Sequence, residues 1–173
     1  IFGINLIDNL DDFKYTPSTG TLYRVRSDVR EYWLEGKTGI RRMELDYVFD
    51  ISQNLFGSIS VGLLEEMFGG VGGEILYHQD DRRWAFGIEA YKVKQRGFSQ
   101  DFSFRDYEIT TGHINFIYDF PRNDIRLKTS FGKYLAGDKG LTIDLSRRFN
   151  NGTHVGAIAA FTDATETEFG EGG

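Results

Sequence analysis

The sequence predicts an all-β fold built as an antiparallel up-and-down meander. Apolar and polar residues alternate over segments of about ten residues, and the side chains of a strand point to opposite faces with a period of two. The clearest segment runs from Leu141 to Arg148 and is followed by Asn151-Gly152, a pair that closes tight hairpins. The composition agrees, because 15% of the 173 residues are aromatic, 21 are glycine and only 2 are proline.

The predicted elements follow in chain order. Residues 1–7 are expected to form a short strand. Residues 8–39 lack sustained alternation, and within them residues 27–35 are expected to form a short helix with Ser27 at its N-cap, although strand propensity leaves a strand open there. Eight further strands are expected, each antiparallel to the next, at residues 40–49, 55–66, 74–79, 83–93, 107–120, 124–134, 140–149 and 153–162.

The connections between these strands fall into two sets. Short turns are expected at 50–54, 80–82, 121–124 and 150–152, and longer or glycine-rich connections at 67–73, 94–106, 135–139 and 162–173. Alternate connections of a meander lie at opposite ends, so all short turns share one rim and all longer loops the other. This asymmetry is typical of an outer-membrane β-barrel. A soluble antiparallel sandwich or a soluble ligand-binding β-barrel alternates too, and both stay open as interpretations.

The two faces of the predicted strands differ in chemistry. In a membrane barrel the apolar rows face lipid and the opposite rows line a wet interior. The residues expected to face lipid are Trp84, Phe86, Phe116, Tyr118, Ile125, Leu127, Leu141, Ile143 and Leu145. The residues expected to line the interior, as a path for a substrate, are Glu89, His113, Asp119, Arg126, Lys128, Asp144 and Arg148. Aromatic residues near strand ends are expected to form interfacial girdles.

Composition narrows the function classes. The net charge of −6 argues against nucleic acid as a partner, because phosphate binding needs a basic surface. The absence of cysteine rules out disulfides and thiolate metal sites within these residues. No apolar run is long enough for a transmembrane helix, and alternating barrel strands do not need one. Neither a metal nor a cofactor is expected, since no three ligands converge in the spacing.

Catalysis has little support in the sequence. A serine hydrolase needs Ser, His and an acid within hydrogen-bonding reach. Ser130 and His113 are a pair that adjacent strands could bring together, and no local motif accompanies them. We therefore predict that the chain is not an enzyme. An outer-membrane barrel enzyme that acts on lipid or polysaccharide remains the alternative.

Charged residues also gather in the connections assigned to the longer-loop rim. They are expected either to pair as a gate over the interior or to form an ordinary solvated surface. These residues are Arg96, Asp101, Arg105, Asp106, Asp138, Lys139, Glu166 and Glu168. Tyr91, Tyr134 and Trp84 could stack on sugar rings if they face inward.

Several segments together resemble a known family. They are residues 24–28 (Arg-Val-Arg-Ser-Asp), 67–74 (Met-Phe-Gly-Gly-Val-Gly-Gly-Glu), 94–96 with 104–107, 110–113 (Thr-Thr-Gly-His), 134–138 with 145–149, and 168–172 (Glu-Phe-Gly-Glu-Gly). From about Arg24 to its end the chain resembles the YjbH family of Gram-negative exopolysaccharide proteins, also called GfcD or YmcA. Members of this family are regarded as outer-membrane β-barrel lipoproteins, much longer than this chain and encoded with polysaccharide export machinery.

The resemblance implies a function without implying catalytic residues. It implies residues 1–173 to be a single β-barrel section of a longer protein in the Gram-negative outer membrane. The section is expected to give a polysaccharide a hydrophilic, porin-like path across the membrane or to anchor the export machinery. The expected partners are membrane lipid, a polysaccharide and a periplasmic polysaccharide-export protein.

Overall fold

The computed structural model describes residues 1–4, 22–23, 28–122, 124–165 and 168. Its main feature is one eight-stranded antiparallel sheet in the order β10-β9-β8-β7-β6-β5-β4-β3, in which every strand pairs with its neighbours in sequence. The strands are β3 (Met43–Ser52), β4 (Leu55–Leu63), β5 (Phe68–His78), β6 (Trp84–Arg96), β7 (Phe104–Asp119), β8 (Ile125–Lys133), β9 (Lys139–Arg148) and β10 (His154–Thr162). The all-β meander predicted from alternation is therefore confirmed.

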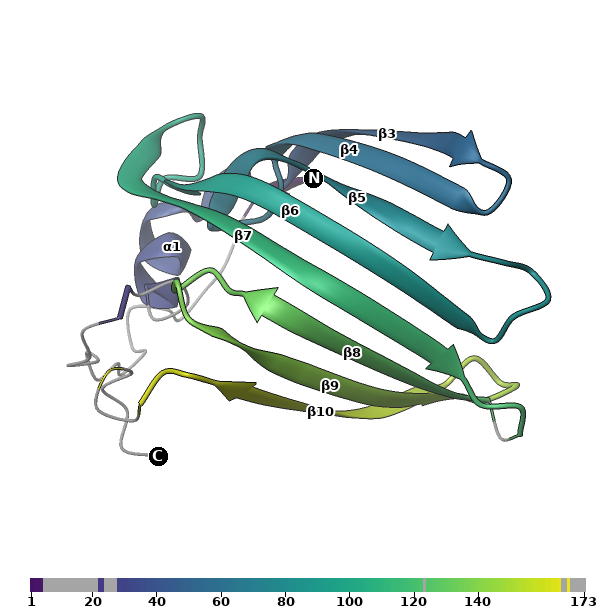
Figure 1. Cartoon of the computed structure of the whole chain (residues 1–173). Helices are drawn as coiled ribbons and strands as arrows, with labels where there is room; N and C mark the ends of the chain where they lie inside the picture. The colour runs from purple at the N-terminus through teal and green to yellow at the C-terminus, as the bar shows by residue number, and fades with distance from the viewer. Residues whose placement is uncertain (5–21, 24–27, 123, 166–167, 169–173) are drawn as a thin grey trace.

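The sheet curls into a trough, with β3 and β10 at its two edges (Figure 1). These two strands do not pair with each other among the described residues, so the sheet is open between them. The N-terminal part adds a two-stranded sheet of β1 (Phe2–Ile4) and β2 (Thr38–Ile40) and one helix, α1 (Val29–Glu35). No helix in the described part of the chain is long and apolar enough to cross a membrane.

The glycine-rich stretch 68–73 corrects one prediction. It was expected to be a loop, but it forms the first half of β5 and pairs with both neighbouring strands. A Cβ at Gly70 would lie 2.2 Å from the Lys92 carbonyl oxygen, and one at Gly72 would lie 2.1 Å from the Tyr91 ring. Glycine here allows close backbone approach inside a strand rather than ending it.

The predicted contrast in loop length is also largely wrong. Because β5 starts at Phe68 and β6 ends at Arg96, the connections shrink to 64–67 and 97–103. The connections 64–67 and 134–138 are no longer than 79–83 and 120–124 at the opposite end. The sheet still has two distinct ends, because α1 lies at only one of them (Figure 1). We call this the helix end, and we call the other, formed by 53–54, 79–83, 120–124 and 149–153, the turn end.

The N-terminal predictions are confirmed in part. Helix α1 lies within the predicted range, but its N-cap is Asp28 rather than Ser27, and it makes no side-chain capping bond. The first strand covers Phe2–Ile4, and the rest of the predicted strand 1–7 lies outside the described residues. Ile40 belongs to β2 and not to the long strand that begins at Met43, because a sharp change of direction at Arg41 and Arg42 separates the two sheets.

Candidate functional site

The register of the sheet separates two faces, because residues directly opposite one another in neighbouring strands point to the same side. Glu89 lies opposite His113, Asp119 opposite Arg126, and Lys128 opposite Asp144, so all of these lie on one side, which we call the polar face. Arg148, the last residue of β9, shares the face of Asp144. The structure thus brings all seven predicted interior residues to the polar face.

The predicted apolar rows lie together on the opposite side, which we call the apolar face. The register joins Phe86 with Phe116, and Leu127 with Leu145, in continuous lines across the sheet. The other members are Trp84, Tyr118, Ile125, Leu141 and Ile143. This partition is the one that the alternation predicted.

Burial on the two faces is the reverse of that in a water-soluble sheet. On the apolar face Ile75 is 52% exposed, Ile88 51% and Phe131 60%. On the polar face Asn115 is 3% exposed and Thr111 8%. A soluble protein rarely leaves an apolar surface of this extent open to water. Asn115 and Thr111 are enclosed by the curl of the sheet, whereas Arg126, Lys128 and Arg148 of the same face are exposed, and the apolar side chains point away from the curl.

Polar groups on the polar face bind one another across the strands. Nδ1 of His113 lies 3.0 Å from Oε1 of Glu89. The Ser130 hydroxyl donates to Oδ1 of Asn115 at 2.6 Å, and no hydrogen bond joins it to His113, whose Nε2 has no hydrogen-bond partner among the described residues. The Tyr134 hydroxyl and the Thr142 hydroxyl form a further bond at 2.6 Å. No three His, Asp or Glu side chains among the described residues are grouped as metal ligands.

The aromatic residues considered for sugar stacking divide between the faces. Tyr91 lies opposite Gly72 and belongs to the polar face, and the Tyr134 ring lies 4.9 Å from the His113 ring on that face. Trp84 lies on the apolar face, where its ring stacks on that of Tyr77 at 5.5 Å. Trp84 therefore belongs with the aromatic residues at the turn end of the apolar face, a group that includes Phe49, Tyr118 and Phe120.

Helix α1 covers the polar face at the helix end. Tyr32 is fully buried and packs with Met67, Phe68 and Val93 in the one buried hydrophobic cluster found in the described residues. Partly buried apolar side chains that extend this cluster include Tyr91, Tyr107, Ile109 and Leu135. Tyr23 stacks on Tyr107 at 3.5 Å and donates its hydroxyl to Oε1 of Gln95 at 2.6 Å. The helix therefore lies inside the curl.

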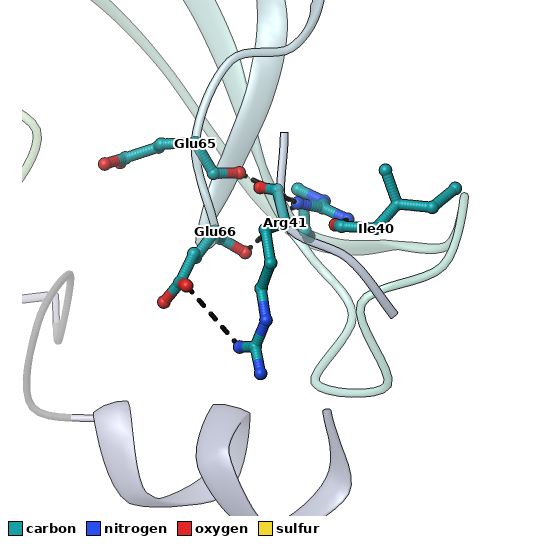
Figure 2. Close-up of polar contacts among 5 residues, drawn as sticks. Ile40, Arg41, Glu65 and Glu66 are labelled. Carbon is teal, nitrogen blue, oxygen red and sulfur yellow. Dashed lines mark hydrogen bonds and ion pairs between the residues drawn. The ribbon is translucent and has the colours of Figure 1, made fainter. Parts of the chain in front are cut away.

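Arg96 fastens the segments around this cluster. Its side chain is fully buried, and Nη1 donates to the carbonyl oxygens of Glu65 at 2.8 Å, Arg41 at 3.2 Å and Glu66 at 3.4 Å. Nη2 donates to the carbonyl oxygens of Ile40 at 2.6 Å and Asp101 at 3.2 Å. Figure 2 shows two of these segments, Ile40–Arg41 and Glu65–Glu66, converging, with the Arg41–Glu66 ion pair beside them. Arg96 thus binds backbone carbonyls rather than a carboxylate.

The remaining residues of the predicted gate bind locally. Arg105 lies over the Phe98 ring at 4.1 Å, and the backbone N–H of Lys139 donates to Oδ1 of Asp163 at 2.7 Å. The Ser103 hydroxyl and N–H lower the pKa of the Asp101 carboxyl, and the N–H and hydroxyl of Thr165 lower that of Glu168. Asp106 is exposed and Asp138 is buried, while Glu166 lies outside the described residues. Among the described members of this set no ion pair joins one to another, and a gating role for them stays a prediction.

Sequence reasoning missed the contribution of the buried residues at the helix end. Tyr32, Gln95 and Gln100 are fully buried, yet nothing in the alternation marks them. Helical spacing of Val29 and Tyr32 was the one available signal, and it predicted a helix without showing which surface the helix covers.

Comparison with known proteins identifies the family. A model of the YjbH family, described as exopolysaccharide biosynthesis protein YbjH, matches residues 2–173. The chain belongs to the YjbH family. It is 41% identical over 175 residues to the uncharacterized lipoprotein YjbH of Escherichia coli (strain K12), an alignment that covers 97% of this chain and 25% of that protein. The chain therefore spans about a quarter of the length of this curated relative. No solved structure matches it.

Proposed function

We propose that this section of a YjbH-family protein forms part of an outer-membrane β-barrel through which an exopolysaccharide passes. The observation that carries the proposal is the reversed burial of the two faces, with exposed apolar residues such as Ile88 on one side and enclosed polar residues such as Asn115 on the other. Lipid is the environment in which exposed apolar strands are stable, because a lipid-facing row on a barrel strand is apolar and a lumen-facing row is polar.

The residues at the border of the apolar face also support the proposal that this face contacts lipid. In β6 the outward residues are Trp84, Phe86, Ile88 and Ala90, and the next outward residue is Lys92, which pairs with Glu108 at 2.8 Å. At the turn end, Arg147 lies 4.5 Å from the centre of the Phe149 ring. A band of apolar residues bounded by aromatic and then charged side chains is the pattern of a strand that crosses a bilayer.

The chemistry of the polar face supports passage of a glycan. Its side chains offer hydroxyl, amide and carboxylate groups that can exchange hydrogen bonds with sugar hydroxyls, as the Asn115–Ser130 and Tyr134–Thr142 pairs illustrate. The side chains of Ser58 and Ser60, which face the same side, are also short. The lipoprotein status of the relative from E. coli is compatible with a place in the cell envelope.

The test is export by cells that carry variants of the full-length protein. Ser60→Trp should narrow the path and lower the amount of extracellular polysaccharide, whereas Ser60→Thr should leave it unchanged. Heat-modifiable mobility on gels checks that both variants assemble to the wild-type level. An assembled Ser60→Trp protein that supports normal export would contradict a path along the polar face and leave an anchoring role.

A further inference from the structure

A pocket lined mainly by polar side chains lies on the polar face at the turn end. It has a volume of about 440 Å³ and is lined by residues of four strands and their turns, among them Arg83, Asp119, Arg126, Arg148 and His154. This volume falls within the range of about 300–1,000 Å³ that small-molecule sites occupy. Helix α1 lies at the opposite end of the sheet (Figure 1), so it does not cover this pocket.

Some charged side chains of the pocket form ion pairs and others do not. Asp119 accepts two hydrogen bonds from Arg126, from Nε at 2.6 Å and from Nη2 at 2.8 Å, and this bidentate pair neutralises both side chains. Arg83 and Arg148 form no ion pair with any residue that the structure describes, although both line the same pocket. Asp124 is the one remaining carboxylate of the lining. Two guanidinium groups are thus available at one site.

The backbone holds both arginines in place. The Asp119 N–H donates to the Arg83 carbonyl oxygen at 2.7 Å, and the Arg148 N–H donates to the Asp124 carbonyl oxygen at 3.2 Å. His154 lies directly opposite Arg148 in the register and adds an imidazole at the same level of the wall. The side chains therefore project from fixed positions on β9, β10 and the start of β6.

The chemistry of these groups selects the ligand. Guanidinium groups bind carboxylate and phosphate in a bidentate manner with attraction between opposite charges, while a neutral sugar only accepts hydrogen bonds from them. Phe120, Pro121 and Ile125 complete the lining and offer an apolar wall to a sugar ring. We propose that this pocket binds the carboxylate or phosphate group of an acidic sugar residue in a polysaccharide chain. The inference rests on the proposed function, since it assigns the polymer an anionic unit.

The position of the pocket on the polar face favours a glycan over a lipid headgroup as the source of the anion. Arg126, Arg148 and Asp119 lie on the polar face, whereas the neighbouring Arg147 points to the apolar face beside Phe149. A headgroup at the membrane border would meet Arg147, and a polymer inside the curl would meet Arg83 and Arg148. Arg147 and Arg148, which are adjacent in β9, therefore offer a matched pair of variants.

The experiment measures binding to purified full-length protein in detergent. The probes are a galacturonate trisaccharide, inorganic phosphate, and maltotriose as the neutral control. We expect the anionic probes to bind in a salt-dependent way and maltotriose to bind at least tenfold more weakly. The double variant Arg83→Gln/Arg148→Gln should lose at least tenfold in affinity, whereas Arg147→Gln should bind like wild type. Unchanged anion binding in the double variant, or equal binding of maltotriose, would overturn the proposal.

Two further readouts separate the sources and the hypotheses. The same variants in nanodiscs with and without anionic phospholipid would reveal a headgroup site. If the double variant no longer responds to anionic phospholipid but still binds the trisaccharide like wild type, the pocket binds a lipid headgroup. That result would overturn the proposal that it binds a glycan. If the wild-type protein does not bind the anionic probes but Ser60→Trp lowers export, the pocket proposal fails and the proposed path remains. Binding without any effect of Ser60→Trp on export would keep the pocket and remove the path.

Discussion

Tyr32 donates its hydroxyl to the carbonyl oxygen of Arg96 at 2.7 Å, while the guanidinium of Arg96 binds backbone carbonyls of three segments, at residues 40–41, 65–66 and 101. This relationship connects α1, the end of β6 and the start of the main sheet through two fully buried side chains. It explains why a helix of seven residues, too short to be stable alone, keeps a fixed place inside the curl.

Removing the Arg96 side chain should release this end of the molecule. Arg96→Ala leaves several partly buried carbonyl oxygens without this partner. A fully buried group of this kind costs about 1–3 kcal/mol, so we expect a loss of about 2–4 kcal/mol in all after partial hydration. Arg105→Ala, which removes an exposed side chain over Phe98, is the matched control. Hydrogen exchange of residues 28–41 in the full-length protein should rise in the first variant only. Equal protection in both would show that Arg96 does not hold the segments together.

The docking of α1 should weaken in alkali. Burial raises the pKa of Tyr32 from its ordinary value of 10.0 to about 12. The neutral phenol is therefore the form that the folded state favours, and this contribution is complete below pH 10 and is lost as the pH rises through about 12. Protease protection of α1 should fall over this interval in the wild type. Tyr32→Phe should not show this fall in protection, because it has no ionisable hydroxyl. Identical pH profiles in the two proteins would show that Tyr32 does not cause the fall.

Helix α1 should also limit conductance. It covers the polar face at the helix end, so its release should open the interior there. In planar bilayers the full-length Tyr32→Ala protein is expected to show larger or longer openings than wild type. Arg105→Ala and Asp138→Ala test the alternative that the charged connections form the gate. Changes in these two variants without a change in Tyr32→Ala would assign the gate to the connections instead of the helix.

The two faces of β9 should tolerate charge differently. Ile143 lies on the apolar face and Asp144 on the polar face, opposite Lys128. Arginine on a lipid-facing position costs about 2–4 kcal/mol at mid-membrane, whereas a wet interior solvates it. We expect Ile143→Arg to reduce the amount of assembled full-length protein and Asp144→Arg to leave it near wild type. Equal assembly of the two variants would count against lipid on the apolar face.

Much of the sheet could be predicted from the sequence, because the period-two alternation is a local property that the fold preserves. The segment Leu141–Arg148 falls on the observed strand, and its residues face as predicted. The error at Gly69–Gly73 has a physical cause. Glycine is rare inside strands on average, but here the neighbouring strands approach so closely that no other residue fits at Gly70.

The candidate site was less accessible to sequence reasoning. The polar face follows from alternation, so Glu89 and His113 were predicted to share it, and they bind each other. The position of α1 and the contacts of Arg96 depend on residues far apart in the chain, as does the pocket that Arg83 and Arg148 line. No local pattern records such long-range contacts. The sequence therefore suggested that Arg96 and Asp101 belong to one group of charged residues in the loops, although the Arg96 side chain is buried.

The proposed membrane barrel requires lipid around the apolar face. Single spin labels at Ile88→Cys and Glu89→Cys, neighbours on opposite faces of β6, can be compared in the full-length protein in a bilayer, on a background without other free cysteines. Collision rates with oxygen, which concentrates in lipid, and with a water-soluble nickel chelate report the environment of each label. We predict that oxygen relaxes the label at position 88 more strongly and that nickel relaxes the label at position 89. Strong nickel and weak oxygen relaxation at position 88 would show that the apolar face does not contact lipid.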